Sequence, residues 1–453
     1  MARSDDSPSR DRGAPAGRRE RFFKLAGMTA SVASKYATSR LSGMFKSDDD
    51  AQDARIEAFK KSGERIAETL GELKGAAMKI GQMASIGSDV LPKELSDALS
   101  KLQKEAPPMA YEVIAEQIER ELGAAPELLF DHFDTEPFAA ASIGQVHRAR
   151  VDDGREVVVK VQYPGVDASV DSDLAHLRLA LRASGLVQKA HRPGLSRTFK
   201  RVRERLHEEL DYTLEADNVR LFGAHHAQHP GIVVPEVVGE RSSKRILTLT
   251  YEPGCSFSEL DREGFTQEER DRVGENLVAA VTSQIFELQA VQADPNPANF
   301  ACRRDGTVVL YDFGCVERIA DDLLTPYVAL IGASWSEDYA LAERYLTELG
   351  ARNLDGPPVE PAFYKRWRDI FLEPFFHDAP FDFGAAELHR KVMEVMPDSI
   401  RRMNSFQPAD RLVFVDRAIT GGYGNLRAIR ARVNVVSPLH GVIELPTREP
   451  SRS

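Results

Sequence analysis

A charged residue interrupts the most strand-like segment of this sequence, because Lys160 stands inside the apolar run from Val157 to Val161. A charge in such a strand is unfavourable unless an opposite charge or a ligand compensates it. The segment around Val146 is also strand-like, and the intervening residues 152–154 (DDG) are typical of a tight turn. The sequence therefore predicts a β-hairpin whose lysine needs a partner.

The loop before this hairpin has an unusual composition for a site that binds phosphate. Loops that wrap phosphate groups are usually rich in glycine, which lets the backbone come close. Here the corresponding residues are Ala139, Ala140, Ala141 and Ser142. A nucleotide-binding hairpin would explain Lys160, and the alanines then require an explanation of their own.

Two acidic motifs follow later in the chain. QADPNPANF (residues 292–300) places Asn299 five residues after Asp294, and LYDFG (residues 310–314) contains Asp312. Mg²⁺ prefers carboxylate and amide oxygens, so Asn299 and Asp312 are predicted metal ligands. Asp294 is predicted to orient, or accept a proton from, the group that attacks a γ-phosphate. The pattern D-x₄-N, a short hairpin and D-F-G is the metal-binding half of a kinase site.

The partner of Lys160 is sought in the acidic segment ELDYTLEADN, residues 209–218. Asp211 and Glu215 are four residues apart, so they share one face of a predicted helix from about 195 to 223. We predict an ion pair between Glu215 and Lys160 that holds the lysine on the α- and β-phosphates of a nucleotide. The alternative is an acidic helix face in solvent.

The order of the remaining elements predicts an α+β chain with a protein-kinase-like, two-lobe fold. Residues 1–53 read as a polar, disordered segment with a basic amphipathic helix from Arg21, which lies either on an anionic membrane or on the protein body. Residues 54–136 are predicted as a helical extension, 137–252 as a strand-rich N-lobe and 253–453 as a large helical C-lobe. Within these, strands are expected at 232–238 and 246–251, and a helix at 111–122.

Composition excludes some functions. The net charge of −11 over 453 residues argues against a nucleic-acid partner. Three cysteines without C-x-x-C spacing indicate neither a disulfide framework nor a zinc site. No apolar run is long enough to cross a bilayer and the N-terminal residues do not resemble a secretory signal. A cytoplasmic protein is expected, attached to a membrane surface at most peripherally.

Six motifs in order make the sequence similar to the ABC1 family of atypical kinases, also called the UbiB or coenzyme Q8 family. They are KIGQ (79–82), AAASIGQVHRA (139–149), VKVQYPGV (159–166), ELDYTLEADN (209–218), DPNPANF (294–300) and YDFG (311–314). Gln292 resembles the coenzyme Q8 branch of the family. The resemblance implies a kinase-like fold, ATP or ADP with Mg²⁺ as cofactors, and support of ubiquinone or other isoprenoid-lipid metabolism.

The same resemblance assigns further residues. In this family an alanine-rich loop replaces the glycine-rich one, so the alanines are expected to alter nucleotide geometry and preference. Lys79 and Gln82 correspond to a lysine and a glutamine on a helix that covers the catalytic site, and Glu209 and Asp211 to an acidic pair that meets the lysine. The absence of an A-P-E motif after Asp312 indicates that loop phosphorylation does not activate the protein.

Three functions are compared. The leading one is an atypical kinase or ATPase acting at a membrane surface, with isoprenoid lipids or quinone-biosynthesis proteins as partners. The second is a phosphotransferase for small soluble molecules, which the KIGQ and alanine-rich segments disfavour. The third is a nucleotide-gated scaffold that binds lipid without turnover.

Overall fold

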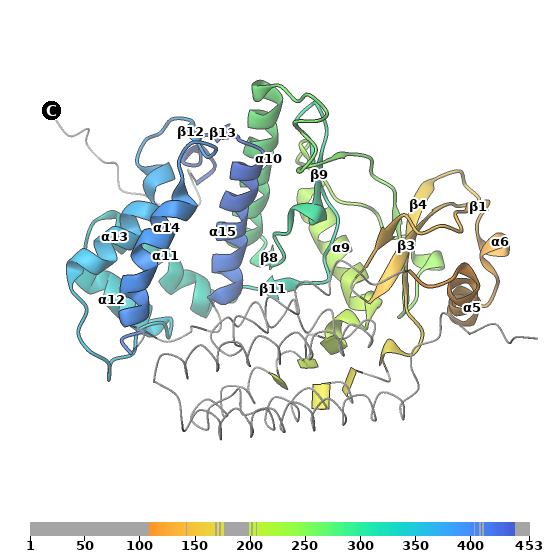
Figure 1. Ribbon diagram of the computed structural model, residues 1–453, viewed down its shortest axis with the longest axis horizontal. Helices are drawn as coiled ribbons and strands as arrows, with labels where there is room; N and C mark the ends of the chain where they lie inside the picture. Colours follow the sequence, from red (N-terminus) through yellow and green to blue (C-terminus); the bar gives the residue numbers. More distant parts are fainter. Residues whose placement is uncertain are drawn as a thin grey trace, which may run out of the picture. The chain divides into compact units, whose positions relative to one another are not determined.

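The computed structural model describes residues 108–141, 143–167, 170–171, 174–175, 199–200, 203–204, 206–402, 404–406, 409 and 412–439 (Figure 1). The predicted N-terminal segment and most of the helical extension, with Lys79 and Gln82, lie outside the described residues, as does Ser142. The described chain divides into two compact units. One ends at Ala216 and also takes in Val237–Tyr251, and the other contains Asp217–Glu236 and the residues from Glu252 onward.

The first unit is built on a five-stranded antiparallel sheet in the order β1-β3-β4-β6, with β2 paired to the free part of β3. Helices α5 and α6, labelled in Figure 1, and the 3₁₀ turn η3 belong to the same unit. The elements are α5 (Tyr111–Leu122), α6 (Pro126–Leu129), β1 (His132–Phe133), β2 (Ala139–Ala140), β3 (Gly144–Arg150), β4 (Glu156–Gln162), η3 (Gly239–Arg241) and β6 (Ile246–Thr250). The helix predicted at 111–122 is confirmed.

The predicted hairpin is formed by β3 and β4, and Lys160 pairs with Val146 in its register. Gly154 closes the turn with a φ of 85°, which glycine adopts without strain. Alternate residues of β4 point to opposite faces: Val157, Val159 and Val161 are fully buried, so Lys160 lies on the other face. The strand pattern therefore directs the lysine away from the most apolar side of the sheet.

The long helix predicted over 195–223 is wrong in one respect, because the chain leaves helical geometry at Leu210 and Asp211. Helix α9 begins afterwards and runs over Tyr212–His226. The Asp211 carboxylate accepts the Thr213 backbone N–H at 3.1 Å and its hydroxyl at 2.5 Å. An aspartate that bonds to nearby N–H groups in this way ends one helix and starts another. Asp211 and Glu215 consequently do not share a helix face.

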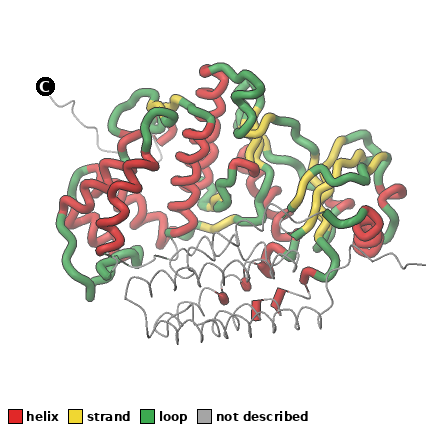
Figure 2. The backbone as a smooth tube through the Cα atoms, in the orientation of Figure 1, coloured by secondary structure: helices red, strands yellow, loops and turns green. Residues whose placement is uncertain are grey.

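The second unit combines small sheets with a large set of helices (Figure 2). A four-stranded sheet has the order β5-β10-β9-β7, while β8 pairs with β11 and β12 with β13. Its strands are β5 (Ile232–Val233), β7 (Cys255–Ser256), β8 (Ala290–Gln292), β9 (Phe300–Cys302), β10 (Val308–Leu310), β11 (Val316–Arg318), β12 (Phe381–Asp382) and β13 (Arg432–Val433). The strand predicted at 232–238 is shorter than expected, because Pro235 has no N–H to continue the ladder.

The helices of this unit are α10 (Gln267–Phe286), η4 (Pro297–Asn299), α11 (Asp321–Trp335), α12 (Tyr339–Glu348), α13 (Pro361–Phe371), η5 (Glu373–Phe375), α14 (Leu388–Arg401), α15 (Val413–Ala428) and η6 (Ser437–Leu439). Helix α10 begins at a capping box in which Thr266 and Glu269 bond to each other's backbone N–H. Helices α10 and α15 lie side by side (Figure 1).

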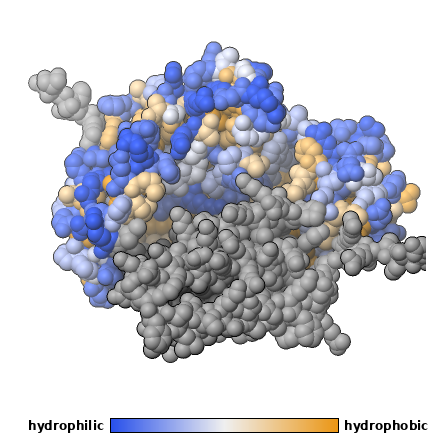
Figure 3. Space-filling view, viewed as in Figure 1, coloured by the Kyte–Doolittle hydropathy of each residue, from blue (hydrophilic) through white to orange (hydrophobic). Residues whose placement is uncertain are grey.

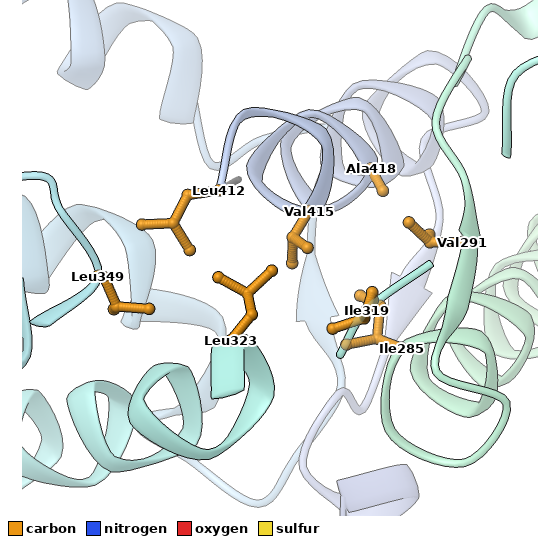
Figure 4. Close-up of a cluster of buried hydrophobic side chains, with 8 residues drawn as sticks. All are labelled: Ile285, Val291, Ile319, Leu323, Leu349, Leu412, Val415 and Ala418. Carbon is orange, nitrogen blue, oxygen red and sulfur yellow. The ribbon is translucent and has the colours of Figure 1, made fainter. Parts of the chain in front are cut away.

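The core of the second unit gathers where α10, α11 and α15 meet. Figure 4 shows side chains from these helices, from β8 and from residues next to β11, α12 and α15 directed into one interior: Ile285, Val291, Ile319, Leu323, Leu349, Leu412, Val415 and Ala418. Burial of this apolar area is the main favourable contribution to folding of such a unit. The core therefore fixes α15 against the strands that carry the acidic motifs.

The described surface is mostly hydrophilic on the face drawn in Figure 3, with hydrophobic groups in small separate patches. The large exposed apolar side chains come from different elements: Leu128, Phe138, Leu214, Leu354 and Met393. No described helix is both long enough and apolar enough to span a bilayer. The amphipathic helix predicted from Arg21, on a membrane or on the protein body, lies outside the described residues.

Candidate functional site

Lys160 and Glu215 form an ion pair within the first unit. The Lys160 ammonium donates to both carboxylate oxygens of Glu215, at 2.9 and 2.8 Å. Only 18% of the lysine side chain and 7% of the glutamate side chain are exposed, and the ammonium also lies 5.0 Å above the ring of Tyr212. The predicted ion pair is confirmed, and it explains how β4 tolerates a charge.

The first two residues of the alanine-rich loop, Ala139 and Ala140, form a short strand. Ala139 pairs with Val146 and Ala140 with Gln145, and the Ala141 N–H donates to the Gly144 carbonyl at 3.0 Å. Ala139 and Ala140 are exposed. The methyl groups of Ala139 and Ala140 are thus not needed to fill the core, and their exposure leaves them able to contact a ligand.

Gly144 has a structural role in the same motif. A Cβ atom on Gly144 would lie 2.2 Å from the carbonyl oxygen of Val161, far inside a normal contact. Only glycine allows β3 and β4 to approach this closely. Gly144 is therefore required in this motif for the close packing of β3 against β4.

Two buried polar residues of the motif, Gln145 and His147, tie the sheet to the segment before α5. Gln145 accepts the Met109 N–H at 2.9 Å, and its amide nitrogen lies 2.9 Å from Nε2 of His147. Nδ1 of His147 lies 2.7 Å from the Asp134 carbonyl, so Nδ1 donates and Nε2 accepts. Burial lowers the pKa of His147, which keeps this tautomer neutral. We did not predict this network from the sequence.

In the second unit, Asp294 and Asn299 contact each other directly. The Asn299 side-chain nitrogen donates to the Asp294 carbonyl at 3.0 Å and to its carboxylate at 3.1 Å. Both partners are acceptors, so the amide orientation is fixed. The Asn299 side-chain oxygen is left as the atom available to a cation. The turn that carries Asn299, η4, is held by Asn296, whose side chain accepts the Ala298 N–H at 3.1 Å.

Asp312 and Phe313 are positioned by contacts from β8 and α9. The Gln292 side chain donates to the Asp312 carbonyl, and one Asp312 carboxylate oxygen accepts the Gly314 N–H at 2.8 Å. Phe313 is fully buried, its ring 4.9 Å from that of Phe222 on α9. The sequence singled out Gln292 as a branch marker only, and the structure shows that it holds the backbone of Asp312.

Helix α15 contributes residues to this site that we did not predict. Arg417 donates to the Asp294 carboxylate at 2.9 Å, and Asn425 donates to the Pro295 carbonyl at 3.1 Å. A Cβ on Gly421 would lie 2.1 Å from Pro295, so the helix and the loop touch there. The spacing of Arg417, Gly421 and Asn425 at four-residue intervals, one helix face, is the only signal of this contact in the sequence.

The acidic pair Glu209 and Asp211 lies in the first unit, where Asp211 is 3.3 Å from the Lys244 ammonium. Thr213 and Lys244 lower the pKa of Asp211, although partial burial opposes them. Glu209 is half-buried. Their predicted contact with Lys79 stays a prediction, because Lys79 lies outside the described residues.

The donor atoms present fit magnesium bound together with a nucleotide. Within the described part of the chain, no three His, Cys, Asp or Glu side chains converge to hold a metal by themselves. Mg²⁺ in nucleotide sites takes only one or two side chains and completes its shell with phosphate oxygens and water. The carboxylate of Asp312 and the amide oxygen of Asn299 match that requirement.

Comparison with known proteins identifies the family, since residues 101–346 match the ABC1 atypical kinase-like domain. The chain belongs to the ABC1 atypical kinase-like family. The ABC1 chain is 34% identical to the mitochondrial atypical kinase COQ8 of Saccharomyces cerevisiae, over 74% of this chain and 66% of that protein. It is 29% identical to mitochondrial COQ8B of Rattus norvegicus, over 92% of this chain and 78% of that protein.

A solved structure shares the fold of this ABC1 chain. It is the complex of Rv3197 with erythromycin from Mycobacterium tuberculosis, with 28% identity, a TM-score of 0.60, and coverage of 88% of this chain and all of that one. The predicted α+β kinase-like fold is confirmed. Among five curated relatives, the ABC1 chain spans between 34% and 69% of the relative's length.

Proposed function

We propose that the protein is an atypical kinase or ATPase that uses ATP, with ADP as product, and Mg²⁺. The observation that carries the proposal is the near-buried Lys160–Glu215 pair, which keeps an ammonium group in place on an apolar strand. An uncompensated lysine there would be unfavourable, and a simple packing role would be filled better by an apolar residue. Membership of the ABC1 atypical kinase-like family supports the proposal.

Each group has a defined role in this proposal. Lys160, held by Glu215, binds the α- and β-phosphates, and the segment from Ala139 to Ala141 faces the phosphate chain. Asn299 and Asp312 hold the cation, which when bound neutralises the negative charge of the phosphates. Gln292 and the Gly314 N–H keep Asp312 in the orientation that this requires.

Asp294 then acts on the attacking group. Its carboxylate is oriented by Asn299 on one side and by Arg417 on the other. Held in this way, it accepts a hydrogen bond from water in an ATPase or from an acceptor hydroxyl in a kinase. The helix with Lys79 and Gln82 is proposed to cover the site, in place of a peptide-binding surface. Glu209 and Asp211 are proposed to meet Lys79.

The biological context is proposed from the coenzyme Q8 resemblance. We assign the activity to ubiquinone or other isoprenoid-lipid metabolism, with quinone-biosynthesis proteins as partners, at an anionic membrane surface that the segment from Arg21 contacts. The second candidate, transfer of phosphate to a small molecule, draws support from the mycobacterial relative, which was solved as a complex with erythromycin.

The proposal is tested by ATP hydrolysis with and without phosphatidylglycerol liposomes. We expect steady ATP turnover by the unaltered protein, with a rate that liposomes increase. The rate should be at least a hundredfold lower in Asp294→Asn and Asp312→Asn. Asp355→Asn, in an exposed turn, is the matched control and should hydrolyse ATP normally. Turnover only with a soluble acceptor would favour the second candidate, and nucleotide binding without any turnover would favour a lipid-binding scaffold.

A further inference from the structure

A large cavity in the second unit lies outside the residues assigned to nucleotide binding. Its volume is about 630 Å³, within the range of cavities that hold small ligands. Side chains of α10, α11, α12, α13 and α15 line it, and most of them are aliphatic or aromatic. Trp335 and Trp367, the only two tryptophans of the chain, are both among them.

One carboxyl group, that of Asp416 on α15, opens into this apolar space. Asp416 lies on the wall of the cavity and its side chain is exposed to water, although many protein atoms surround its carboxyl group. Burial raises the pKa of Asp416 to about 6. The hydrogen bond that it receives from the Tyr327 hydroxyl is long, at 3.5 Å. A carboxylate in apolar surroundings is stabilised by a shorter hydrogen bond than the one from Tyr327, and the cavity has room for a ligand that donates such a bond.

Helix α15 places this carboxyl next to the catalytic loop. Val413, Asp416 and Tyr423 line the cavity from one face of the helix. Arg417 follows Asp416 directly and, from another face, donates to Asp294. Anything that fills the cavity therefore contacts the helix that orients Asp294.

We propose that the cavity binds an apolar molecule with one hydrogen-bond donor at its end, a hydroxyl or an amine, and that α15 transmits its occupancy to Asp294. The apolar part lies among the core helices, and the donor bonds to the Asp416 carboxylate. The binding claim stands apart from the proposed function, which enters only in naming Asp294 as catalytic.

Binding is measured by quenching of intrinsic fluorescence with 10-bromodecan-1-ol, because bromine quenches tryptophan on contact and both tryptophans line the cavity. We expect saturable quenching, and similar quenching by 10-bromodecylamine. At pH 8 we expect at least tenfold weaker binding of 10-bromodecanoate, whose charge repels Asp416. Asp416→Asn should remove this discrimination while preserving the fold. Non-saturable quenching, or equal binding of all three probes to the unaltered protein, would overturn the proposal.

Two glycines of α15 provide a matched pair of variants. A Cβ on Gly422 meets only Val281, at 4.0 Å, so Gly422→Leu projects a side chain where the cavity opens. Gly424 is exposed with nothing within 4 Å, so Gly424→Leu adds the same bulk elsewhere. We expect at least tenfold weaker 10-bromodecan-1-ol binding in Gly422→Leu alone. Equal binding of 10-bromodecan-1-ol by both variants would place the ligand outside the cavity and overturn the proposal. If Gly422→Leu does not fold, the probe discrimination measured with Asp416→Asn tests the proposal instead.

Transmission to the catalytic loop is measured by amide hydrogen exchange, which needs no turnover. With saturating 10-bromodecan-1-ol we expect at least threefold slower exchange over residues 293–299 in the unaltered protein and in Gly424→Leu. Arg417→Ala should retain quenching but lose this protection. Unchanged exchange in the ligand-bound protein would overturn the transmission through α15. A protein that binds the probe yet never hydrolyses ATP would refute the proposed function alone.

Discussion

Replacing Lys160 with methionine keeps the length of the side chain but leaves the Glu215 carboxylate buried without its ammonium. Breaking a buried ion pair by removing one partner destabilises a protein by about 3–5 kcal/mol. Because 18% of the Lys160 side chain remains exposed, we expect the low end, about 3 kcal/mol. Glu215→Gln should cost less, about 2 kcal/mol, because the amide still accepts a hydrogen bond and Tyr212 stays beneath the ammonium.

The double variant tests whether the two side chains stabilise the fold as a unit. With both charges removed no buried charge is unpaired, so we expect a loss of about 3 kcal/mol and a coupling energy of about 2 kcal/mol. The assay is urea unfolding followed by circular dichroism. The exposed pair Arg150–Glu156, on the same hairpin at 3.8 Å, is the control and should couple by less than about 0.5 kcal/mol. Additive effects at Lys160 and Glu215 would refute the reasoning.

The remaining predictions concern packing and pH. Gly144→Ala should lower the free energy of unfolding by about 3 kcal/mol in urea unfolding, because the added methyl meets the Val161 carbonyl; a loss below about 1 kcal/mol would contradict the strand spacing. Gly421→Ala should lower kcat more than nucleotide affinity, because its methyl displaces Pro295 in the catalytic loop. The pKa of Asp416 is raised in the folded protein, so its contribution to the free energy of unfolding should be present near pH 4 and lost as the pH rises through about 6. The melting temperature should fall over the same pH range. Asp416→Asn should remove that fall in melting temperature, and an unchanged pH profile would contradict the assignment.

Short-range sequence patterns, such as alternating apolar residues and turn motifs, correctly predicted the hairpins of the fold. Alternation in β4 and the DDG turn gave the hairpin, and the pairing of Val308 with Cys302 bears out the hairpin expected between the acidic motifs. The partner of Lys160 was predicted because a lysine in an apolar strand needs a compensating group, and Glu215 lies in an acidic segment of a predicted helix. The break at Asp211 was missed because helical spacing does not reveal a side chain that bonds to the backbone.

Contacts between distant segments could not be predicted in the same way. Arg417 lies 123 residues after Asp294, and its spacing with Gly421 marks a helix face without naming what that face contacts. Gln145 and His147 look like ordinary strand residues in the sequence, and their hydrogen bonds depend on Met109 and Asp134. Tertiary packing determines which distant residues form hydrogen bonds, and this packing cannot be read from the local pattern of a single sequence.

The central claim is that Asp312 and its neighbours bind a nucleotide through magnesium, and calorimetric titration of ATP tests it most directly. Titrations of the unaltered protein and of Asp312→Asn are compared in excess Mg²⁺ and in excess EDTA. We predict that Mg²⁺ raises the affinity of the unaltered protein for ATP at least tenfold and leaves that of Asp312→Asn unchanged. An equal gain from Mg²⁺ in both proteins, or no ATP binding by the unaltered protein, would contradict the account.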